Sequence, residues 1–158
     1  TALDSFGDAQ IGATMEDYGK LIPLVPLVKT AWAEGRVTKR ERHLIFEAAA
    51  RMDVKPGTSA YKKLSEWLEL HPTDEFYDHA LDILQMRWRH LDANEKNRRR
   101  FDLLSDCTLV AEASGGAKNY PSGGAKICDE EIAAVKYIAQ KLNVPAAHNA
   151  VANQMYEN

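Results

Sequence analysis

Apolar residues recur at intervals of three and four along most of this chain, and polar residues fill the positions between them. The clearest run is 129–142, where the apolar residues share one face of a helix. No segment alternates with the period of two that is typical of a half-buried strand. The pattern therefore predicts an all-α fold, with about seven helices packed as antiparallel hairpins. Besides 129–142, helices are expected over about 15–22, 24–34, 38–52, 58–71, 73–88 and 92–111.

Residues that start and stop helices stand where this pattern changes. Thr38 is followed three positions later by Glu41, which is the spacing of a capping box, where each side chain satisfies a free N–H group of the first turn. Asp92 and Glu95 repeat the arrangement. Gly35 stands where a left-handed residue often ends a helix. These signals predict a tight turn between the second and third helices.

The chain has 158 residues, a length typical of one domain with a substantial core. Residues 1–14 show no clear period and are interpreted as a loose lead-in, followed by a single helical domain over 15–158. The stretch 115–126 is rich in Gly, with Ser and Pro, and predicts a flexible loop. Pro145 suits the first turn of a final short helix.

The charge balance argues against two classes of partner. A net charge of −3 gives no support for nonspecific binding to nucleic acid or to an anionic membrane. The arginine run 98–100 has acidic neighbours and is interpreted as a solvated helix face. The longest apolar run, 21–28, contains Pro23 and Pro26 and is far shorter than the roughly 20 residues that a membrane-spanning helix needs. We therefore expect no nucleic-acid partner and no integral membrane segment.

Cys107 and Cys128 are the only cysteines of the sequence. Their spacing fits neither a disulfide framework nor a metal-ligand motif, so we interpret them as two buried, reduced thiols. The first residues also lack the basic and apolar regions of a secretory leader. Together these observations predict a cytoplasmic protein.

One short pattern occurs twice in the chain. Residues 31–41 read AWAEGRVTKRE, and residues 111–115 read AEASG, followed after an insertion by ICDEE at 127–131. Each copy is Ala-x-Ala-polar-Gly, then an aliphatic residue, then a Glu in the first turn of the next predicted helix. We interpret this duplication as a repeated helix–turn–helix element.

The first copy resembles the signature of the TerB-like tellurite-resistance family, a helix that ends in Ala-x-Ala-Asp-Gly followed by an aliphatic residue, a polar gap and a Glu. The resemblance covers 15–143 in organisation and implies an all-helical fold whose two elements are related by an internal pseudo-twofold. It also implies a role in tellurite resistance, in stress responses to toxic oxyanions and in membrane-linked complexes, with metal ions held by acidic residues at the turns. This chain departs from the family pattern, because the usual Asp is Glu34 in the first copy and Ser114 in the second, where 116–126 lengthens the turn.

Acidic residues at these turns are the candidate metal ligands. Glu34 and Glu41 belong to the first copy, and Asp129 and Glu131 are the candidates of the second. Helix capping alone explains Glu41 and Glu131, whereas Glu34 stands at a helix C-terminus, where the helix dipole disfavours a negative charge. Glu34 therefore either accepts N–H bonds from the backbone near 37–38 or shares a divalent cation with Glu41. A tight calcium site takes about 6–8 oxygen ligands, so carbonyl groups or water would have to complete one.

A second set of side chains suggests an alternative metal site. His43 with Glu47, and Glu75 with His79, are pairs four residues apart, so each pair offers two ligands on one helix face. A zinc enzyme is the alternative function if these two pairs converge. The sequence carries no nucleophile elbow and no HExxH motif. The Gly-rich stretch 115–126 also lacks the Gly-Lys-Ser/Thr ending of a phosphate-binding loop.

We therefore expect a noncatalytic, TerB-like domain of the cytoplasm that acts in a tellurite or metal-stress response. It would act through contacts with other proteins and carry a divalent cation at its first acidic turn, and peripheral membrane association is compatible with this expectation. Two other functions stay open at this point. One is a metal-dependent enzyme with a helical His/Glu site, and the other is a purely structural interaction module without an ion.

Overall fold

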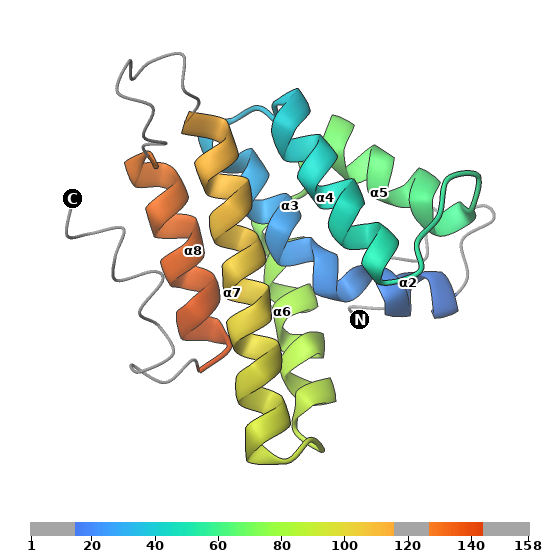
Figure 1. Cartoon of the computed structure of the whole chain (residues 1–158), viewed down its shortest axis with the longest axis vertical. Helices are drawn as coiled ribbons and strands as arrows, with labels where there is room; N and C mark the ends of the chain where they lie inside the picture. Colours follow the sequence, from blue (N-terminus) through green and yellow to red (C-terminus); the bar gives the residue numbers. More distant parts are fainter. Residues whose placement is uncertain (1–14, 116–126, 144–158) are drawn as a thin grey trace.

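The computed structural model describes residues 15–115 and 127–143, and within these ranges every regular element is helical. The all-α prediction is thereby confirmed for the described part of the chain (Figure 1). The expected lead-in at 1–14, most of the expected loop at 115–126 and the expected helix at Pro145 lie outside the described residues. The elements are α2 (Met15–Leu21), the 3-10 turn η1 (Ile22–Leu24), α3 (Val25–Ala31), the 3-10 turn η2 (Trp32–Glu34), α4 (Lys39–Arg51), α5 (Ser59–Glu69), α6 (Asp74–Trp88), α7 (Ala93–Gly115) and α8 (Asp129–Lys141).

The predicted capping residues do form the ends of these helices. Thr38 and Glu41 make both hydrogen bonds of the capping box that starts α4. The Asp92 carboxylate accepts the N–H of Glu95 at 2.8 Å at the start of α7. Gly35 follows η2 with φ of +89°, the left-handed conformation that glycine adopts without a steric penalty. The turn between η2 and α4 is therefore fixed by residues whose roles can be read from the sequence.

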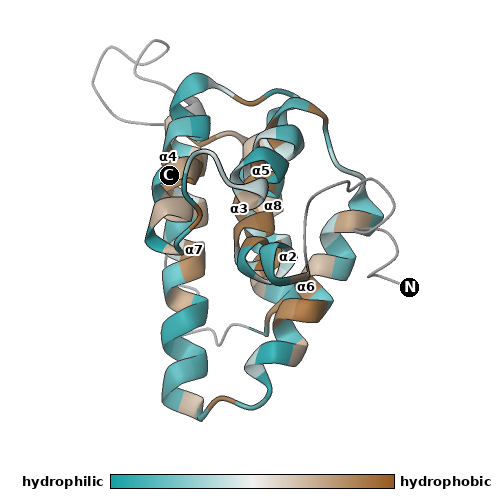
Figure 2. Cartoon of the chain, turned by 90° about the vertical axis from the view of Figure 1, so that its right-hand side faces the viewer, coloured by the Kyte–Doolittle hydropathy of each residue, from teal (hydrophilic) through white to brown (hydrophobic). Residues whose placement is uncertain are grey.

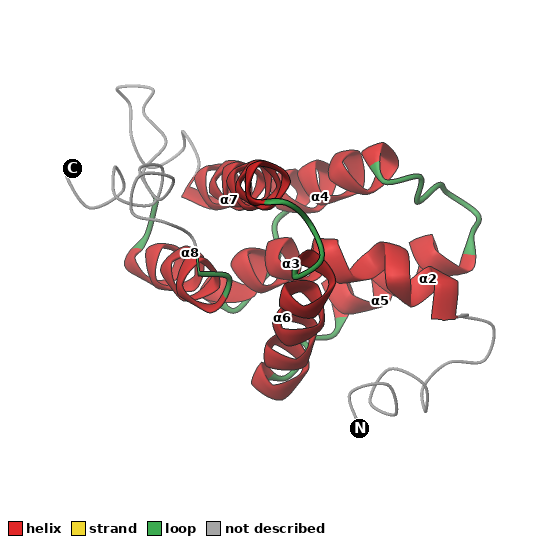
Figure 3. Cartoon of the chain, turned by 90° about the horizontal axis from the view of Figure 1, so that it is seen from below, coloured by secondary structure: helices red, strands yellow, loops and turns green. Residues whose placement is uncertain are grey.

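The short helix α3 lies at the centre of the fold. It packs against α4, α6, α7 and α8. Figure 3 shows α3 in one row with α8 and α2, with the α4–α7 layer on one side of it and α6 on the other. Its residues from Val25 to Val28 are all buried, which is the pattern of a helix that is apolar on every side. Pro23 lies within η1 and Pro26 lies in the first turn of α3, so the run 21–28 bends without breaking a helix interior.

The last described helix, α8, docks against α6 through two polar contacts four residues apart. The hydroxyl of Tyr137 donates to the carboxylate of Asp78, and the ammonium of Lys141 donates to Asp82 at 3.2 Å. Because both partners advance by one helical turn in the same direction, α6 and α8 run parallel past each other (Figure 1). This docking brings the start of α8 to the end of η2, where a candidate site forms.

The hydropathy of the helices agrees with this arrangement. Figure 2 shows hydrophobic positions along α3 and hydrophilic positions over much of α4 and α7. The apolar side chains of α3 form one core cluster with those of the surrounding helices, and Leu24, Val28 and Leu104 in it are fully buried. Within the described ranges, no helix combines the length and the hydrophobicity needed to cross a bilayer.

Candidate metal centre

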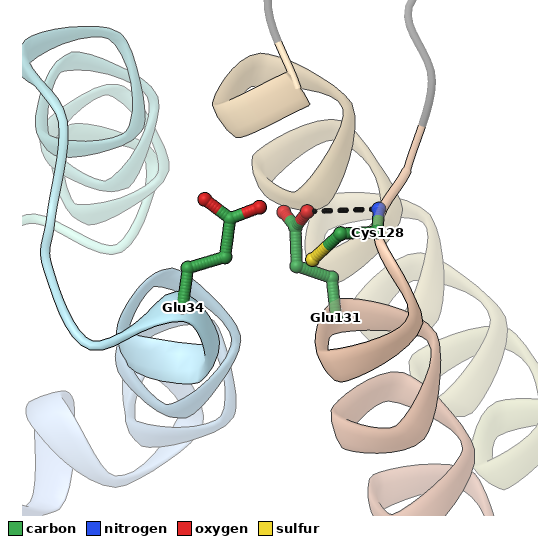
Figure 4. Close-up of side chains that lie close together, drawn as sticks. All are labelled: Glu34, Cys128 and Glu131. Carbon is green, nitrogen blue, oxygen red and sulfur yellow. Dashed lines mark hydrogen bonds between the residues drawn. The ribbon is translucent and has the colours of Figure 1, made fainter.

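The end of η2 and the start of α8 bring three potential metal ligands together. Glu34 comes from η2, Cys128 immediately precedes α8, and Glu131 lies in the first turn of α8. One ligand atom from each residue lies within 4.8 Å of the others, and Figure 4 shows the three side chains pointing toward one another. Of the residues that the structure describes, no other group of three His, Cys, Asp or Glu side chains approaches this closely. We call these residues the Glu34–Cys128–Glu131 cluster.

The same local structure positions the acidic residue at the start of α4 and of α8. The N–H of Thr38 donates to the carboxylate of Glu41 at 2.8 Å, and the N–H of Cys128 donates to that of Glu131 at 3.1 Å. In both helices the Glu is the third residue and reaches back to the residue that precedes the helix. Both carboxylates are buried, with 1% of Glu41 and none of Glu131 exposed. Helix capping therefore fixes the positions of two acids that are unusually buried for their type.

Glu41 lies in an environment that opposes its negative charge. Its Oε1 atom accepts the N–H of Thr38, but Oε2 is buried and has no hydrogen-bond partner within the described residues. The pKa of Glu41 is raised from the usual 4.5 to about 7. Burial is the largest cause, two hydrogen bonds to Thr38 act in the opposite direction, and the charges of Glu131 and Glu34 contribute to the rise. At neutral pH a bound proton would stabilise the buried carboxyl group of Glu41. A cation close to Glu131 and Glu34 would have the same effect.

The thiol of Cys128 is held in its neutral form. Burial is the largest cause that raises its pKa above the ordinary range, and hydrogen bonds to the Glu131 and Glu34 side chains raise the pKa in the same direction. A neutral thiol can donate to a carboxylate, whereas a thiolate beside two carboxylates would be repelled. A metal ion would have to displace this proton before Cys128 served as a thiolate ligand.

The structure brings together some of the predicted ligands and separates others. Glu34 and Glu131 meet in the cluster, and Glu41 interacts electrostatically with both. Asp129 is exposed and is not a member of the cluster. The expected bond from Glu34 to the turn backbone is not found in the described part of the chain, because the N–H of Thr38 is taken by Glu41. Glu34 instead faces the start of α8 (Figure 4).

Both cysteines are free thiols, as the sequence interpretation expected, but the expected burial is confirmed for Cys107 and wrong for Cys128. Cys107 is a fully buried thiol of the core. Cys128 is half-buried and belongs to the cluster. Its position directly before three consecutive acids, where Thr38 stands in the first copy, is the signal that could have identified it. Spacing between the two cysteines carried no such information.

The alternative zinc ligands do not converge. His43 and Glu47 pair with each other at 3.0 Å on α4, and both side chains are more than half exposed. Glu75 and His79 lie on α6, and neither pair joins a group of three ligands in the residues that the structure describes. The set that sequence spacing suggested for a zinc enzyme is therefore not assembled in this fold.

The donor atoms of the cluster suit a divalent cation. Two carboxylates and a thiol supply three ligands, and the buried carboxylate of Glu41 adds negative charge behind them. Carboxylates alone suit Mg²⁺, Ca²⁺ and Mn²⁺, whereas a cysteine ligand favours ions such as Zn²⁺. Zinc sites usually have four ligands in a tetrahedral arrangement, so a water molecule would complete the set.

Comparisons with protein-family models, with curated proteins and with solved structures found no match to this chain.

Proposed function

We propose that this chain is a noncatalytic, TerB-like helical domain that binds a divalent cation between its two acidic turns. In this proposal it works in the cytoplasm in a tellurite or metal-stress response, through contacts with other proteins. The observation that carries the cation site is the convergence of Glu34, Cys128 and Glu131 beside the buried, half-satisfied carboxylate of Glu41.

The electrostatics of the cluster support a bound cation. Three carboxylates that interact with one another destabilise the folded chain unless a proton or a metal ion offsets their charge. The Oε2 atom of Glu41 lacks a partner in the described residues, which is uncommon for a buried carboxylate. A cation bound at the cluster would lie close to Glu34, Glu41 and Glu131. Its positive charge would therefore reduce the repulsion among all three carboxylates.

The matching starts of α4 and α8 support the TerB-like part of the proposal. Both copies of the repeated pattern place a Glu as the third residue of a helix, and both glutamates reach back to the preceding N–H. The two starts also lie close enough for Glu41 and Glu131 to interact electrostatically. The family resemblance implies two repeated elements whose turns hold metal ions through acidic residues, and we propose that in this chain the two turns share one cation.

Cys128 favours a particular kind of ion. A thiol among the ligands raises the affinity for Zn²⁺ relative to Mg²⁺ and Ca²⁺, which prefer oxygen ligands only. We therefore propose Zn²⁺, or a similar ion that accepts sulfur and oxygen ligands, as the preferred cation. The zinc-enzyme alternative has less support, because its His43–Glu47 and Glu75–His79 pairs do not converge.

Titration calorimetry with Ca²⁺, Mg²⁺, Mn²⁺ and Zn²⁺ tests the cation site. The wild-type chain should show saturable binding that is strongest for Zn²⁺, and Glu34→Ala should weaken it by about tenfold or more, as the loss of a ligand group does. Cys128→Ser should remove the preference for Zn²⁺ over Mn²⁺. The matched control is Glu75→Ala, which removes an exposed first-turn acid of α6 outside the cluster.

Two results would reject the cation site. One is the absence of saturable binding of all four ions to the wild-type chain. The other is unchanged affinity in Glu34→Ala, whose side chain is exposed and whose loss should leave the fold intact. The stress-response part has its own test, in which cells carrying only the Glu34→Ala chain should tolerate tellurite or excess zinc less well than cells carrying Glu75→Ala.

A further inference from the structure

A hollow of about 350 Å³ lies beside the cluster and is lined by different side chains. Four rings contribute to its wall, from η2, from the segment before α6, from α6 and from α8. A lysine of α3 and two carboxylates also line it. We call this hollow the ring pocket, and the side chains that matter here are Trp32, His71, Tyr77 and Tyr137 with Lys29, Asp74 and Glu130.

The aromatic side chains offer flat surface more than hydrogen bonds. Trp32 stacks on His71 with 4.7 Å between the ring centroids and 4° between the planes. The indole N–H of Trp32 donates to the carbonyl of Trp67 at 2.8 Å, and the hydroxyl of Tyr137 donates to Asp78. Because these polar atoms already have protein partners, the two side chains present their rings to a ligand.

Lys29 supplies the positive charge of this wall, and among the described residues that charge has no acidic partner. Its Nζ atom lies 4.9 Å from the ring centroids of both Tyr77 and Tyr137. No carboxylate of the described residues lies within ion-pair distance of it. The two cation–π contacts hold the ammonium in place but leave its hydrogen-bond donors for an acceptor. A carboxylate is the group that would form the strongest hydrogen bonds with it.

The remaining charges limit what kind of anion fits. Asp74 and Glu130 place two negative charges in the lining against the single positive charge of Lys29. A ligand with two or more negative charges would be repelled, whereas one carboxylate can pair with Lys29. The volume is at the lower end of the range for small-molecule sites, which corresponds to a ligand of one or two rings.

We propose that the ring pocket binds a small aromatic monocarboxylate, with its carboxylate on the ammonium of Lys29 and its ring against the aromatic wall. The arrangement follows the usual anatomy of a small-molecule site, where rings supply most of the contact and one charged group fixes the orientation. This inference does not depend on the proposed cation site, because Glu34, Cys128 and Glu131 do not line the pocket. The ring pocket is therefore a second proposed binding site, next to the Glu34–Cys128–Glu131 cluster.

The test uses benzoate, benzylamine and phenyl phosphate as probes, in buffer that contains EDTA so that cation binding does not contribute. Calorimetry and proton–nitrogen NMR spectra should show saturable binding of benzoate, with shifts at the indole N–H of Trp32. In the proposed orientation benzylamine would place its ammonium against that of Lys29, and phenyl phosphate carries about two negative charges that Asp74 and Glu130 would repel, so both should bind at least about tenfold more weakly.

Variants of Lys29 separate the charge from the shape of the pocket. Lys29→Met keeps the length of the side chain and should weaken benzoate binding about tenfold or more, the usual effect of losing a charged hydrogen bond. Lys29→Arg keeps the positive charge and should retain most of the affinity. The matched control is Lys62→Met, because Lys62 is an exposed lysine of α5 outside the pocket and should leave binding unchanged.

Three outcomes would overturn the proposal. They are no saturable binding of benzoate, equal binding to the wild-type chain and a folded Lys29→Met variant, or tighter binding of benzylamine than of benzoate. Thermal unfolding of each variant shows whether it is folded. If Lys29→Met does not fold, Lys29→Arg tests whether the positive charge at this position is sufficient for benzoate binding. A failure here leaves the calorimetry of metal ions unaffected, since the two tests use different ligands and different variants.

Discussion

A buried carboxylate with one unused oxygen is the most unusual single residue of this chain. Glu41 caps α4 with Oε1 and leaves Oε2 without a partner among the described residues. Its pKa of about 7 means that it gains a proton near neutral pH when no cation is present. The same residue therefore stabilises the start of a helix and makes the fold sensitive to pH.

The pH dependence of stability follows from this pKa. In the unfolded chain Glu41 titrates near its usual 4.5, and in the folded chain near 7, so the folded state binds more protons between these values. The contribution of Glu41 to the free energy of unfolding of the metal-free protein should therefore be most favourable at low pH. It should fall as pH rises from about 4.5 to 7, by roughly 3 kcal/mol at most, and then level off.

Urea unfolding in EDTA at pH values from 5 to 8 measures this dependence. Glu41→Gln has no carboxyl to titrate, so the difference in stability between the variant and the wild-type chain should shift in favour of the variant as pH rises. Glu75→Ala serves as the control, because an exposed acid should leave the pH profile close to that of the wild type. Equal slopes for Glu41→Gln and the wild type would contradict the assignment.

Individual residues differ in how well the sequence predicts them. Thr38 and Glu41 are three positions apart, so their capping bonds are local and follow from spacing alone. Glu34 and Cys128 meet only because η2 and α8 pack together, and no local pattern reports that contact. The sequence therefore marks Glu34 and Glu131 as candidate ligands, whereas it does not mark their thiol neighbour Cys128.

Among the elements, the turn between η2 and α4 depends on one glycine. Gly35 has φ of +89°, and a side chain added there would meet no atom within 4 Å. The penalty for a larger residue thus comes from backbone strain and not from a clash.

Substitutions at Gly35 measure that strain. Gly35→Ala should lower the free energy of unfolding by about 1–2 kcal/mol, because alanine disfavours the left-handed region. Gly35→Asn should lose less, since asparagine tolerates that conformation best among the non-glycine residues. Chemical denaturation of both variants gives the comparison, and equal stability of the alanine variant and the wild type would show that the turn adopts another conformation in solution.

The helix predicted over 24–34 has different boundaries in the structure, and the sequence pattern does not determine them. The structure divides it into α3 and the tighter turn η2, whose closing hydrogen bond runs from the N–H of Gly35 to the carbonyl of Trp32 at 2.8 Å. Such tightening is common in the last turn of a helix and leaves the apolar pattern unchanged. It does move Glu34, because a 3-10 turn places its side chains differently from an α-helical one. The direction of that candidate ligand thus depends on a detail that periodicity does not contain.

At the scale of the whole molecule, α8 is part of the core and not an appendage. It packs on α7, α3 and η2, and Val135 and Ile138 are fully buried. Two polar contacts to α6 fix its register along that helix. The cluster therefore depends on the packing of the entire domain, since Glu131 lies on α8 and Cys128 directly precedes it.

Cooperative unfolding is the consequence that can be measured. Ile138→Ala should lower the free energy of unfolding by about 2–5 kcal/mol, the usual loss for a buried aliphatic side chain, and unfolding should stay a single transition. Gln140→Ala, at an exposed position of the same helix, should change stability by less than about 0.5 kcal/mol. Two separate transitions in Ile138→Ala, with helix content lost in two steps, would show that α8 unfolds independently.

The global prediction from sequence was correct in class and incomplete in arrangement. Helical spacing and the absence of strand patterns predicted an all-α chain, and the described residues confirm it. The parallel course of α6 and α8 did not follow from the sequence, because the contacts of Tyr137 and Lys141 join residues far apart along the chain. Loop lengths suggest which helices are neighbours in sequence, but they do not show how distant helices are paired.

Trp32, which stacks on His71, can serve as an intrinsic fluorescence probe of this region. Trp32 stands two positions before Glu34 and also lines the ring pocket, while Trp67 and Trp88 are buried with 6% and 7% of their surface exposed. Only the half-buried indole of Trp32 thus senses a change in solvent at this corner of the molecule, over a nearly constant background from the other two. An unlabelled sample in an ordinary fluorimeter should therefore report, through its emission maximum, when either neighbouring site is filled.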